Sequence, residues 1–262
     1  MYNDLFSIGP FTVHGYGLMI VIGMIAAYLV SMYRAKRMNI NTDHIDSLAI
    51  WGILGGVVGA KIMYWLTQIE NIIQNPRILL NIADGFVVYG GIIGGVLAGY
   101  LYCRHKKILF LQYLDLIIPT IALAQGFGRI GCFLAGCCYG LETTGSCYVV
   151  FPSYSFAPAG VPLIPTQLIS SGLDFLLFVI LILYAKRKKA EGQVAALYMV
   201  LYSAGRFVLE FFRGDLIRGS VGALTTSQFI SIWVFVIGVG VLIFSYLKKE
   251  KLMLGAIIIK WA

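Results

Sequence analysis

The sequence predicts an all-α integral membrane protein with seven transmembrane helices, and three observations lead to this prediction. Hydrophobic residues make up 59% of the 262 residues and charged residues only 12%, with a mean hydropathy of +0.85. Such a chain has too little polar surface to cover a soluble globule. Apolar windows of about 20 residues, the length that crosses the hydrocarbon core, recur along the chain. Basic residues gather in every second loop between these windows.

The apolar windows mark the seven predicted spans. They run roughly over 15–33, 47–66, 86–103, 110–127, 167–185, 193–212 and 223–247. Together they form a single transmembrane domain over 1–262, with an outward loop over about 128–165 and a short cytoplasmic tail over about 248–262. Prolines recur between 141 and 165, so we expect no helix in that stretch.

The basic residues predict the orientation of the chain. They follow the first, third, fifth and seventh spans, as Arg34, Lys36 and Arg37, then Arg104, Lys106 and Lys107, then Lys186, Arg187, Lys188 and Lys189, and finally Lys248, Lys249 and Lys251. Cytoplasmic loops are the basic ones, which places the N-terminus outside and the C-terminus in the cytoplasm. The formal net charge of +8 then reflects topology and contact with anionic membrane lipids, and we expect no nucleic-acid partner.

Other charged residues fall within spans or toward the outer side: Lys61, Arg77, Asp115, Arg129, Asp174, Arg206, Glu210, Arg213 and Arg218. A charge at membrane depth costs a few kcal/mol or more, so it usually faces a polar cavity and marks a functional pathway. The alternative is a structural role, in which the group is paired or snorkels to the interface. We favour the structural role for Lys61, Arg77, Asp115, Asp174 and Arg218, and the functional role for the other four.

The stretch GRFVLEFFRGD carries three of these four residues. Arg206, Glu210 and Arg213 stand at i, i+4 and i+7, which is one stripe of a helix. A carboxylate between two arginines would stay ionised and would orient the guanidinium groups. The stripe can be a self-contained set of ion pairs. The excess of positive charge instead predicts a site for an anion, and the abundant anion in a membrane is a lipid phosphate.

Glycines divide into two groups. Those in GGVVGA and VYGGIIGGVLAG have four-residue spacing, which predicts close contact between helices. In GFGRIGCFLAGCCYG they are Gly126, Gly128, Gly131, Gly136 and Gly140, which is too many for a good helix. Irregular backbone near the membrane is tolerated where it lines a cavity, and we expect Arg129 to project into that cavity, which would be accessible to lipid.

The cysteines of the same stretch form the pattern C-x4-C-C-x8-C, with Cys132, Cys137, Cys138 and Cys147. Three interpretations remain open: disulfides in an oxidising exterior, small hydrophobic side chains at a helix interface, or thiols used in catalysis or metal binding. The spacing matches no standard zinc motif and no histidine stands nearby, so we predict no metal.

Several stretches together resemble the prolipoprotein diacylglyceryl transferases, which are seven-span bacterial membrane enzymes. They are FSIGPFTVHGYGLM, FVVYGGIIGG, GFGRIGCFLAGCCYG and GRFVLEFFRGD, with weaker support from IPTQL and LTTSQFISI. Their order covers nearly the whole chain. The resemblance implies transfer of the diacylglyceryl group of phosphatidylglycerol to the lipobox cysteine of a prolipoprotein signal peptide. It also implies the bacterial cytoplasmic membrane, an active site toward the outer leaflet, and no cofactor.

The resemblance also implies roles for individual residues. Those implied as catalytic are Arg129, Arg206, Tyr16, Tyr89 and Glu210, and those implied in phosphatidylglycerol binding are Arg129, Arg206, Arg213, Gly140 and His14. Positioned guanidinium groups stabilise the charge of a departing phosphate, as this reaction requires.

The chain departs from the family pattern at three positions. Tyr89 stands where the family usually has histidine, and Cys132 and Cys137 stand where it usually has asparagine and glutamate. A tyrosine with its ordinary pKa of about 10 is a poor base at neutral pH, although Tyr89 can hydrogen-bond a phosphate or a thiol. Two alternatives follow: a paralogue that uses another thiol or a hydroxyl acceptor, and a lipid-binding or transport protein without catalysis.

Overall fold

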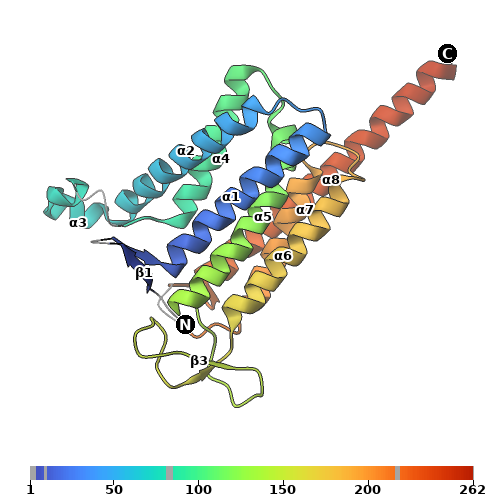
Figure 1. Ribbon diagram of the computed structural model, residues 1–262. Coiled ribbons are helices and arrows are strands. Elements are labelled where there is room, and N and C mark those ends of the chain that lie inside the picture. The colour runs from blue at the N-terminus through green and yellow to red at the C-terminus, as the bar shows by residue number, and fades with distance from the viewer. Residues whose placement is uncertain (1–3, 9–10, 81–84, 216–218, 262) are drawn as a thin grey trace. The chain divides into compact units, whose positions relative to one another are not determined.

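The computed structural model describes residues 4–8, 11–80, 85–215 and 219–261, and these form two compact units. The first unit comprises Met1–Ser31 and Leu114–Ala262, and the second comprises Met32–Tyr113. The described residues are predominantly α-helical (Figure 1).

Long helices dominate the first unit. They are the N-terminal part of α1 (Gly15–Arg37), most of α5 (Phe110–Ala135), α6 (Thr166–Ala185), α7 (Gln193–Glu210) and α8 (Thr226–Trp261). Three antiparallel hairpins accompany them: β1 (Asp4–Ile8) with β2 (Phe11–His14), β3 (Val149–Val150) with β4 (Pro162–Leu163), and β5 (Ser220–Val221) with β6 (Leu224–Thr225).

Helix α5 contacts three other helices of this unit. Gly23 of α1 lies against α5, because a Cβ there would come within 3.0 Å of the Ala124 carbonyl oxygen. The Ser171 hydroxyl of α6 donates to the Gly126 carbonyl over 2.9 Å, and the Tyr198 hydroxyl of α7 donates to Gln125 Oε1 over 2.9 Å. The position of Arg129 on α5 is therefore fixed against both α6 and α7.

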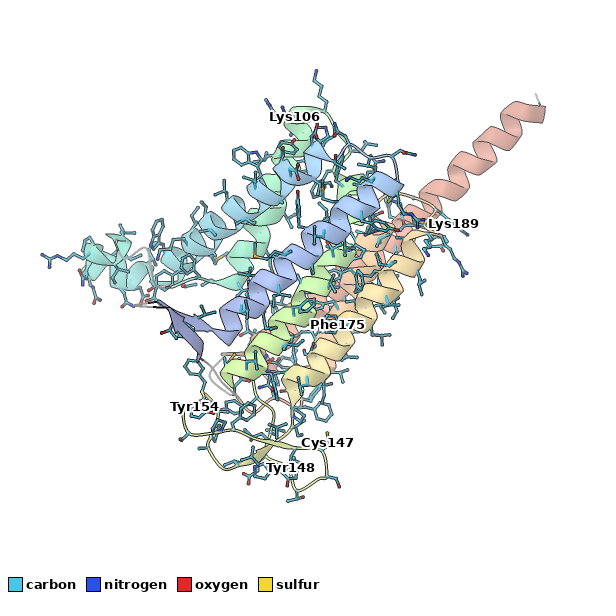
Figure 2. The ribbon with its side chains drawn as sticks, viewed as in Figure 1. Lys106, Cys147, Tyr148, Tyr154, Phe175 and Lys189 are labelled. Carbon is cyan, nitrogen blue, oxygen red and sulfur yellow. The ribbon has the colours of Figure 1, made fainter. Side chains whose placement is uncertain are left out.

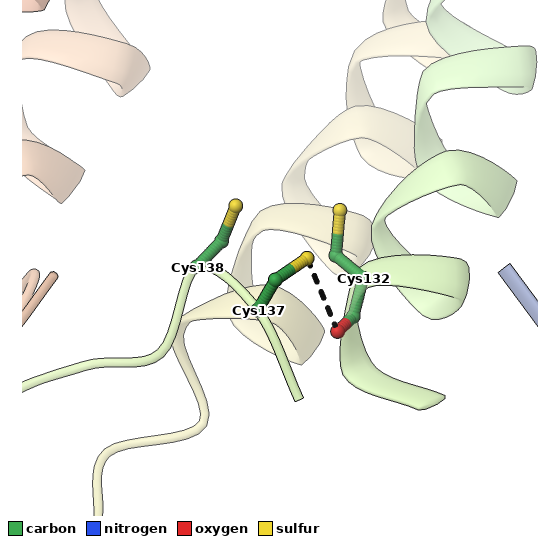
Figure 3. A group of neighbouring side chains, drawn as sticks. All are labelled: Cys132, Cys137 and Cys138. Carbon is green, nitrogen blue, oxygen red and sulfur yellow. Dashed lines mark hydrogen bonds between the residues drawn. The ribbon is translucent and has the colours of Figure 1, made fainter. Parts of the chain in front are cut away.

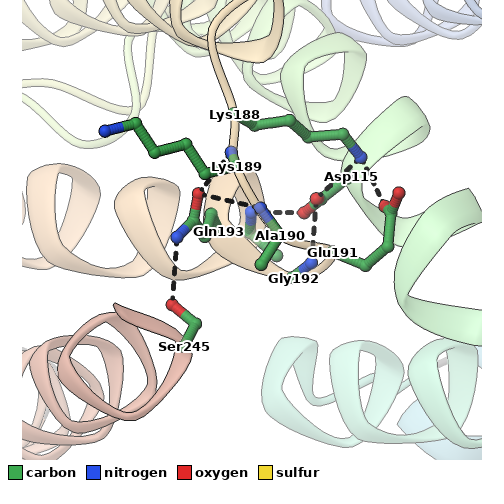
Figure 4. A network of polar contacts seen from close by, with 9 residues as sticks. Asp115, Lys188, Lys189, Ala190, Glu191, Gly192, Gln193 and Ser245 are labelled. Atoms are coloured by element: carbon green, nitrogen blue, oxygen red, sulfur yellow. Dashed lines mark hydrogen bonds and ion pairs between the residues drawn. The ribbon is translucent and has the colours of Figure 1, made fainter. Parts of the chain in front are cut away.

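The turn between α6 and α7 is fixed by Asp115 of α5, which is 1% exposed (Figure 4). Its Oδ2 accepts hydrogen bonds from the Gly192 N–H over 2.8 Å and from Lys188 Nζ over 3.1 Å, and its Oδ1 accepts one from the Ala195 N–H over 3.0 Å. Asp115 thus satisfies N–H groups at the start of α7, which have no partner inside that helix. The predicted structural role of Asp115 is confirmed.

The segment 136–165 joins α5 to α6 at the end of the unit opposite the α6–α7 turn. Figure 2 shows Tyr148 and Tyr154 on this segment and Lys189 at the other end of the helices. The segment has its own small core of Phe151, Ala157 and Leu163. It contains β3 and β4 and no helix over 141–165, as predicted.

The second unit consists of α2 (Asp43–Thr67), α3 (Ile69–Gln74), the 3₁₀ helix η1 (Pro76–Leu80) and α4 (Val88–Lys106). Helices α2 and α4 approach each other through glycines: a Cβ on Gly94 would lie 2.9 Å from the Gly59 Cα. The predicted close helix contact is confirmed. Lys61 is buried, and its Nζ lies 5.1 Å and 5.2 Å from the ring centroids of Tyr64 and Phe86, which supports its predicted structural role.

Five helices of the described chain are long and apolar enough to cross a membrane: α1, α2, α5, α6 and residues 226–247 of α8. Helices α4 and α7 coincide with the other two predicted spans but do not meet that standard. Helix α4 is rich in glycine and ends in Arg104, His105 and Lys106, and α7 has only 18 residues, which include Arg206 and Glu210. The structure therefore shows an all-α membrane protein, with five candidate spans among the described helices.

Three boundaries differ from the predicted ones. Helix α5 continues to Ala135, so the loop begins at Gly136 and not near 128. Gly128 and Gly131 do not interrupt α5, because a single glycine costs a helix only about 1 kcal/mol and packing compensates for it. Helix α8 continues through 248–261, where we expected a separate tail, since no proline interrupts it. Helix α7 ends at Glu210, so Arg213 lies beyond the helix that was predicted to carry it.

Candidate active site

Arg206, Glu210 and Arg213 meet at the C-terminal end of α7. Glu210 Oε2 lies 2.8 Å from Arg206 Nη2 and 3.9 Å from Arg213 Nη1, so the predicted carboxylate between two arginines is confirmed. The turn after Glu210 folds Arg213 back toward the helix end, which retains the contact although α7 has stopped. Arg206 Nη2 also donates to Ser227 Oγ of α8 over 3.1 Å, and this contact holds the guanidinium from a second helix.

Asp215 pairs with Arg213 through two hydrogen bonds, of 2.9 Å from Nε and 2.7 Å from Nη2. No sequence pattern singles out Asp215, and its carboxylate offsets one of the positive charges. The expected excess of positive charge is therefore absent when the arginines and carboxylates of this described region are counted together. The attraction for an anion is local, and it depends on how Arg129 and Arg206 are placed relative to Asp174.

A cavity of about 140 Å³ lies between α6 and α7, with Arg129 of α5 in its wall. Its polar lining comprises Arg129, Ser170, Asp174, Tyr202 and Arg206, and its apolar lining comprises Leu173, Leu176, Leu177, Ile180, Leu201 and Leu209. The lining residues furthest from the long loop, Ile180 of α6 and Leu201 of α7, are apolar, whereas Ser170 and Arg206 stand near the helix ends that adjoin the loop. The cavity is therefore amphipathic along its length.

A second, smaller cavity adjoins the first and shares Arg129, Ser170, Arg206 and Leu209 with it. Its other lining residues are Cys138, Thr166, Gln167 and Arg213. Two buried atoms of this lining, Gln167 Oε1 and Arg213 Nη1, have no hydrogen-bond partner among the described residues. Buried polar atoms are rarely left without a partner, and here one acceptor and one donor are available to a polar ligand.

Asp174 is the acidic residue of the larger cavity. It is 5% exposed and lies within electrostatic reach of both Arg129 and Arg206. We favoured a structural role for it from the sequence, but the structure places it in the cavity wall with the two arginines. Tyr202 was also missed. It stands one turn before Arg206 on α7, and this i, i+4 spacing was the signal that could have identified it.

Three of the cysteines gather where α5 ends (Figure 3). The Cys137 N–H donates to the Cys132 carbonyl over 3.1 Å and the Gly136 N–H donates to the Phe133 carbonyl over 3.2 Å, with Gly136 at φ +76°. This pair of bonds is the Schellman motif, which ends a helix by returning the chain over its last turn. It places Cys137 over Cys132, and the Cys137 thiol donates to the Cys132 carbonyl over 3.7 Å.

None of the five cysteines, all of which are described residues, forms a disulfide in the structure, so the structure shows none of the disulfides that the sequence allows. Cys147 is exposed and Cys103 is buried in the second unit. Hydrogen bonds with Cys132 and Cys138, together with burial, raise the pKa of the Cys137 thiol. A protonated thiol is a weak nucleophile, so the arrangement does not favour a catalytic role for Cys137 in the absence of a ligand.

Tyr16 lies close to this region. It is the second residue of α1, and a Cβ on Gly131 of α5 would lie 3.1 Å from its carbonyl oxygen. Its hydroxyl is within electrostatic reach of Arg129 and of the three thiols. His14 ends β2 and lies outside the lining of the two cavities described above. The structure therefore brings Tyr16, Arg129 and Arg206 to the same end of the first unit.

Gly140, for which we predict a role in lipid binding, has a packing role in the structure. Its N–H donates to the Ile164 carbonyl over 3.1 Å, and a Cβ on Gly140 would lie 2.5 Å from that same oxygen. It also forms an isolated antiparallel β-bridge with the backbone of Arg213. Gly140 thus allows the loop to run against the segment after α7. Tyr89, by contrast, belongs to the first turn of α4 in the second unit.

Comparison with known proteins gives one consistent result. The family model described as prolipoprotein diacylglyceryl transferase matches residues 3–244. The phosphatidylglycerol–prolipoprotein diacylglyceryl transferase of Clostridium tetani is 47% identical over 246 residues, which cover 94% of this chain and 98% of that protein. Transferase 2 of Clostridium perfringens is 45% identical over 91% of this chain and 93% of its own length, and the Finegoldia magna transferase is 35% identical over 89% and 92%.

Proposed function

The chain belongs to the prolipoprotein diacylglyceryl transferase family, and on this basis we propose that it transfers the diacylglyceryl group of phosphatidylglycerol to the lipobox cysteine of prolipoproteins. A sulfur–carbon bond forms at the glyceryl carbon next to the phosphate. The bond from that carbon to the phosphate oxygen breaks, glycerol phosphate leaves with the electron pair, and the thiol proton passes to a base. The substrates are the two that the relatives' names give.

The amphipathic cavity is the observation that supports this function. Arg129 and Arg206 stand with Asp174 in a wall whose remaining residues are mostly leucine. A phosphate can lie at the arginines while an acyl chain follows the apolar part between α6 and α7. Guanidinium groups aimed at the departing phosphate stabilise the charge that develops as it leaves.

The unpartnered atoms of the smaller cavity suit the glycerol headgroup. Gln167 Oε1 accepts a hydrogen bond and Arg213 Nη1 donates one, and a glycerol hydroxyl can do both. Thr166 and Ser170 add hydroxyl groups to the same lining. The headgroup would then lie toward the long loop, and the diacylglyceryl part would lie between α6 and α7.

Asp174 is the group that we place as proton acceptor for the incoming thiol. The chain has Tyr89 where the family usually has histidine, so another base is needed. An anion held at Arg129 and Arg206 repels the Asp174 carboxylate, which favours its taking up a proton.

Other residues support the reaction. Tyr16, near Arg129, can hydrogen-bond the phosphate or the thiol, and Glu210 keeps Arg206 oriented. We further propose Tyr89 as a hydrogen-bond donor to the phosphate or the thiol, and Gly140 and His14 as residues that bind phosphatidylglycerol.

The orientation in the membrane is part of the proposal. We place seven spans in the bacterial cytoplasmic membrane, with α4 and α7 added to the five candidate helices, the N-terminus outside and the C-terminus in the cytoplasm. The basic α6–α7 turn then faces the cytoplasm. The cavity arginines lie near the opposite helix ends and face the outer leaflet, where prolipoproteins present their cysteine. A single membrane domain with this orientation accounts for the charge distribution.

The test combines the purified full chain with phosphatidylglycerol and a peptide that contains a lipobox and a single cysteine. Mass spectrometry then measures the diacylglyceryl thioether and the released glycerol phosphate. We expect both products in equal amounts, and expect their loss in the Arg129→Ala and Arg206→Ala variants. Lipid that binds stoichiometrically but yields neither product would contradict the proposal and indicate a binding or transport protein.

A further inference from the structure

Cys132, Cys137 and Cys138 form a compact group of thiols, and their three Sγ atoms all lie within 4.8 Å of one another (Figure 3). None of the three side chains is exposed. The linear spacing matches no standard zinc motif, and only the fold brings the third sulfur to the other two. We propose that these three thiols bind a soft, thiophilic metal ion, for which Zn²⁺ is the reference.

The backbone holds the group in place before any ion arrives. The Schellman motif fixes Cys137 over Cys132, and Cys138 follows in the left-handed region at φ 62°. Helix α6 fixes the two loop cysteines from the other side: Gln167 Nε2 donates to the Cys137 carbonyl over 2.8 Å, and Thr166 Oγ1 donates to the Cys138 carbonyl over 3.0 Å. Three ligands on a fixed backbone lose little further entropy on binding.

The sulfur geometry suits such an ion. Zinc–sulfur bonds are about 2.3 Å long, which puts tetrahedrally placed sulfurs about 3.8 Å apart. The present group needs a contraction of no more than about 1 Å, which rotation about the Cα–Cβ bonds can provide. Binding forms three metal–sulfur bonds and releases up to three protons to solvent, and no electron is transferred. One coordination position stays open to water or a ligand.

The chemistry of the site selects soft ions. The group contains thiols only, without a carboxylate or imidazole, and thiolates prefer Zn²⁺, Cu⁺ and related ions over Mg²⁺ or Ca²⁺. Three thiolates around a divalent ion leave one negative charge. Arg129 lies within electrostatic reach of Cys132 and Cys138 and offsets that charge, which lowers the free-energy cost of partly burying the thiolates.

The site adjoins the cavities but does not depend on the transfer reaction. Cys138 also lines the smaller cavity together with Arg129. The net negative charge of three thiolates around a bound divalent ion would therefore compete with a lipid phosphate for Arg129. Metal binding can be measured directly, so its failure would not be confused with failure of the transferase proposal.

The experiment titrates the full-length protein, in detergent and reduced with a phosphine, with Cd²⁺ as a spectroscopic substitute for Zn²⁺. Sulfur-to-cadmium charge-transfer absorption should rise to saturation at one ion per chain. Zn²⁺ should displace the signal, whereas Mg²⁺ should not. Because a phosphine contains no sulfur, the sulfur-to-cadmium absorption reports the thiols of the protein.

Cys138→Ser is the test variant and Cys147→Ser is its matched control, because Cys147 is exposed and outside the group. The affinity of Cys138→Ser should fall about tenfold or more, since even outer-shell changes at metal sites cost 10- to 100-fold. Cys147→Ser should bind like the parent. Thermal unfolding without metal must show that both variants are folded, and Cys132→Ser serves as a second test variant.

Two results would overturn the proposal. One is a parent protein that shows no stoichiometric signal, or that binds Mg²⁺ equally well. The other is a folded Cys138→Ser variant that binds with the affinity of the parent. If peptide mapping without reductant instead found a disulfide within the group and no metal binding after reduction, the thiols would be a redox pair and the metal site would be rejected.

Discussion

Arg206 and Glu210 form an ion pair across one turn of α7, with 2.8 Å between Arg206 Nη2 and Glu210 Oε2. The same guanidinium nitrogen donates to Ser227 of α8, so two helices hold one arginine at the cavity wall. In the reaction proposed above, a side chain fixed in this way needs no reorganisation when charge develops on the departing phosphate. Preorganised charge of this kind is usually the largest contribution to catalysis.

Replacement of Arg206 by glutamine should lower kcat/KM for diacylglyceryl transfer by about 100- to 1,000-fold, because one positioned donor to the departing phosphate is lost. The peptide assay with mass spectrometry measures the change. Arg206→Lys should also lose most of the activity, since lysine keeps the charge but lacks the planar fork.

Arg77→Gln is the matched control for Arg206→Gln, because Arg77 is an exposed arginine of η1. Its activity should equal that of the parent. Equal losses in both variants would show that the effect is a general response to removal of positive charge and would argue against a specific role for Arg206.

Asp174→Asn should lower kcat by about 100-fold or more while phosphatidylglycerol binding persists, because asparagine cannot accept the thiol proton. Measurement of lipid binding in parallel with turnover separates the two effects. Asp174→Glu keeps a carboxylate and should recover part of the rate. Full activity in Asp174→Asn would exclude Asp174 as the base and direct attention to Tyr89 or Tyr16.

Gly140→Ala should destabilise the folded protein by about 1–3 kcal/mol, because the new Cβ would lie 2.5 Å from the Ile164 carbonyl oxygen. Thermal unfolding in detergent measures the loss. Gly128→Ala is the control, since a Cβ there meets nothing within 4 Å and α5 should gain slightly from alanine. A stable but inactive Gly140→Ala variant would instead favour the role in lipid binding that family resemblance implies.

Asp115→Ala should cost about 2–4 kcal/mol of stability, because it leaves the Gly192 and Ala195 N–H groups and Lys188 without their buried acceptor. Thermal unfolding and hydrogen exchange at the start of α7 would measure this. Exposed Glu142→Ala is the control for loss of a carboxylate. An unchanged midpoint in Asp115→Ala would contradict the anchoring role.

Much of the fold follows from local properties of the sequence. The apolar windows predict seven long helices because burial in hydrocarbon requires continuous apolar runs, and a helix lies in each window. The glycines at four-residue spacing in GGVVGA and VYGGIIGGVLAG predict the close contact of α2 and α4. Helix ends were harder to predict, because α5 and α8 both continue beyond the apolar windows. Packing and helix length compensate there for residues with low helix propensity.

The sequence by itself determined the membrane class, the family and the arginines of the candidate site. A charged residue within an apolar run is costly, so it can be recognised without a structure. Only the tertiary structure decided which charged residues share a cavity. Asp174 joins Arg129 and Arg206 because three different helices converge there, and no periodicity along one helix records that meeting. The thiol group depends likewise on backbone turns at Gly136 and Cys138, since left-handed conformations set side-chain directions that linear spacing does not contain.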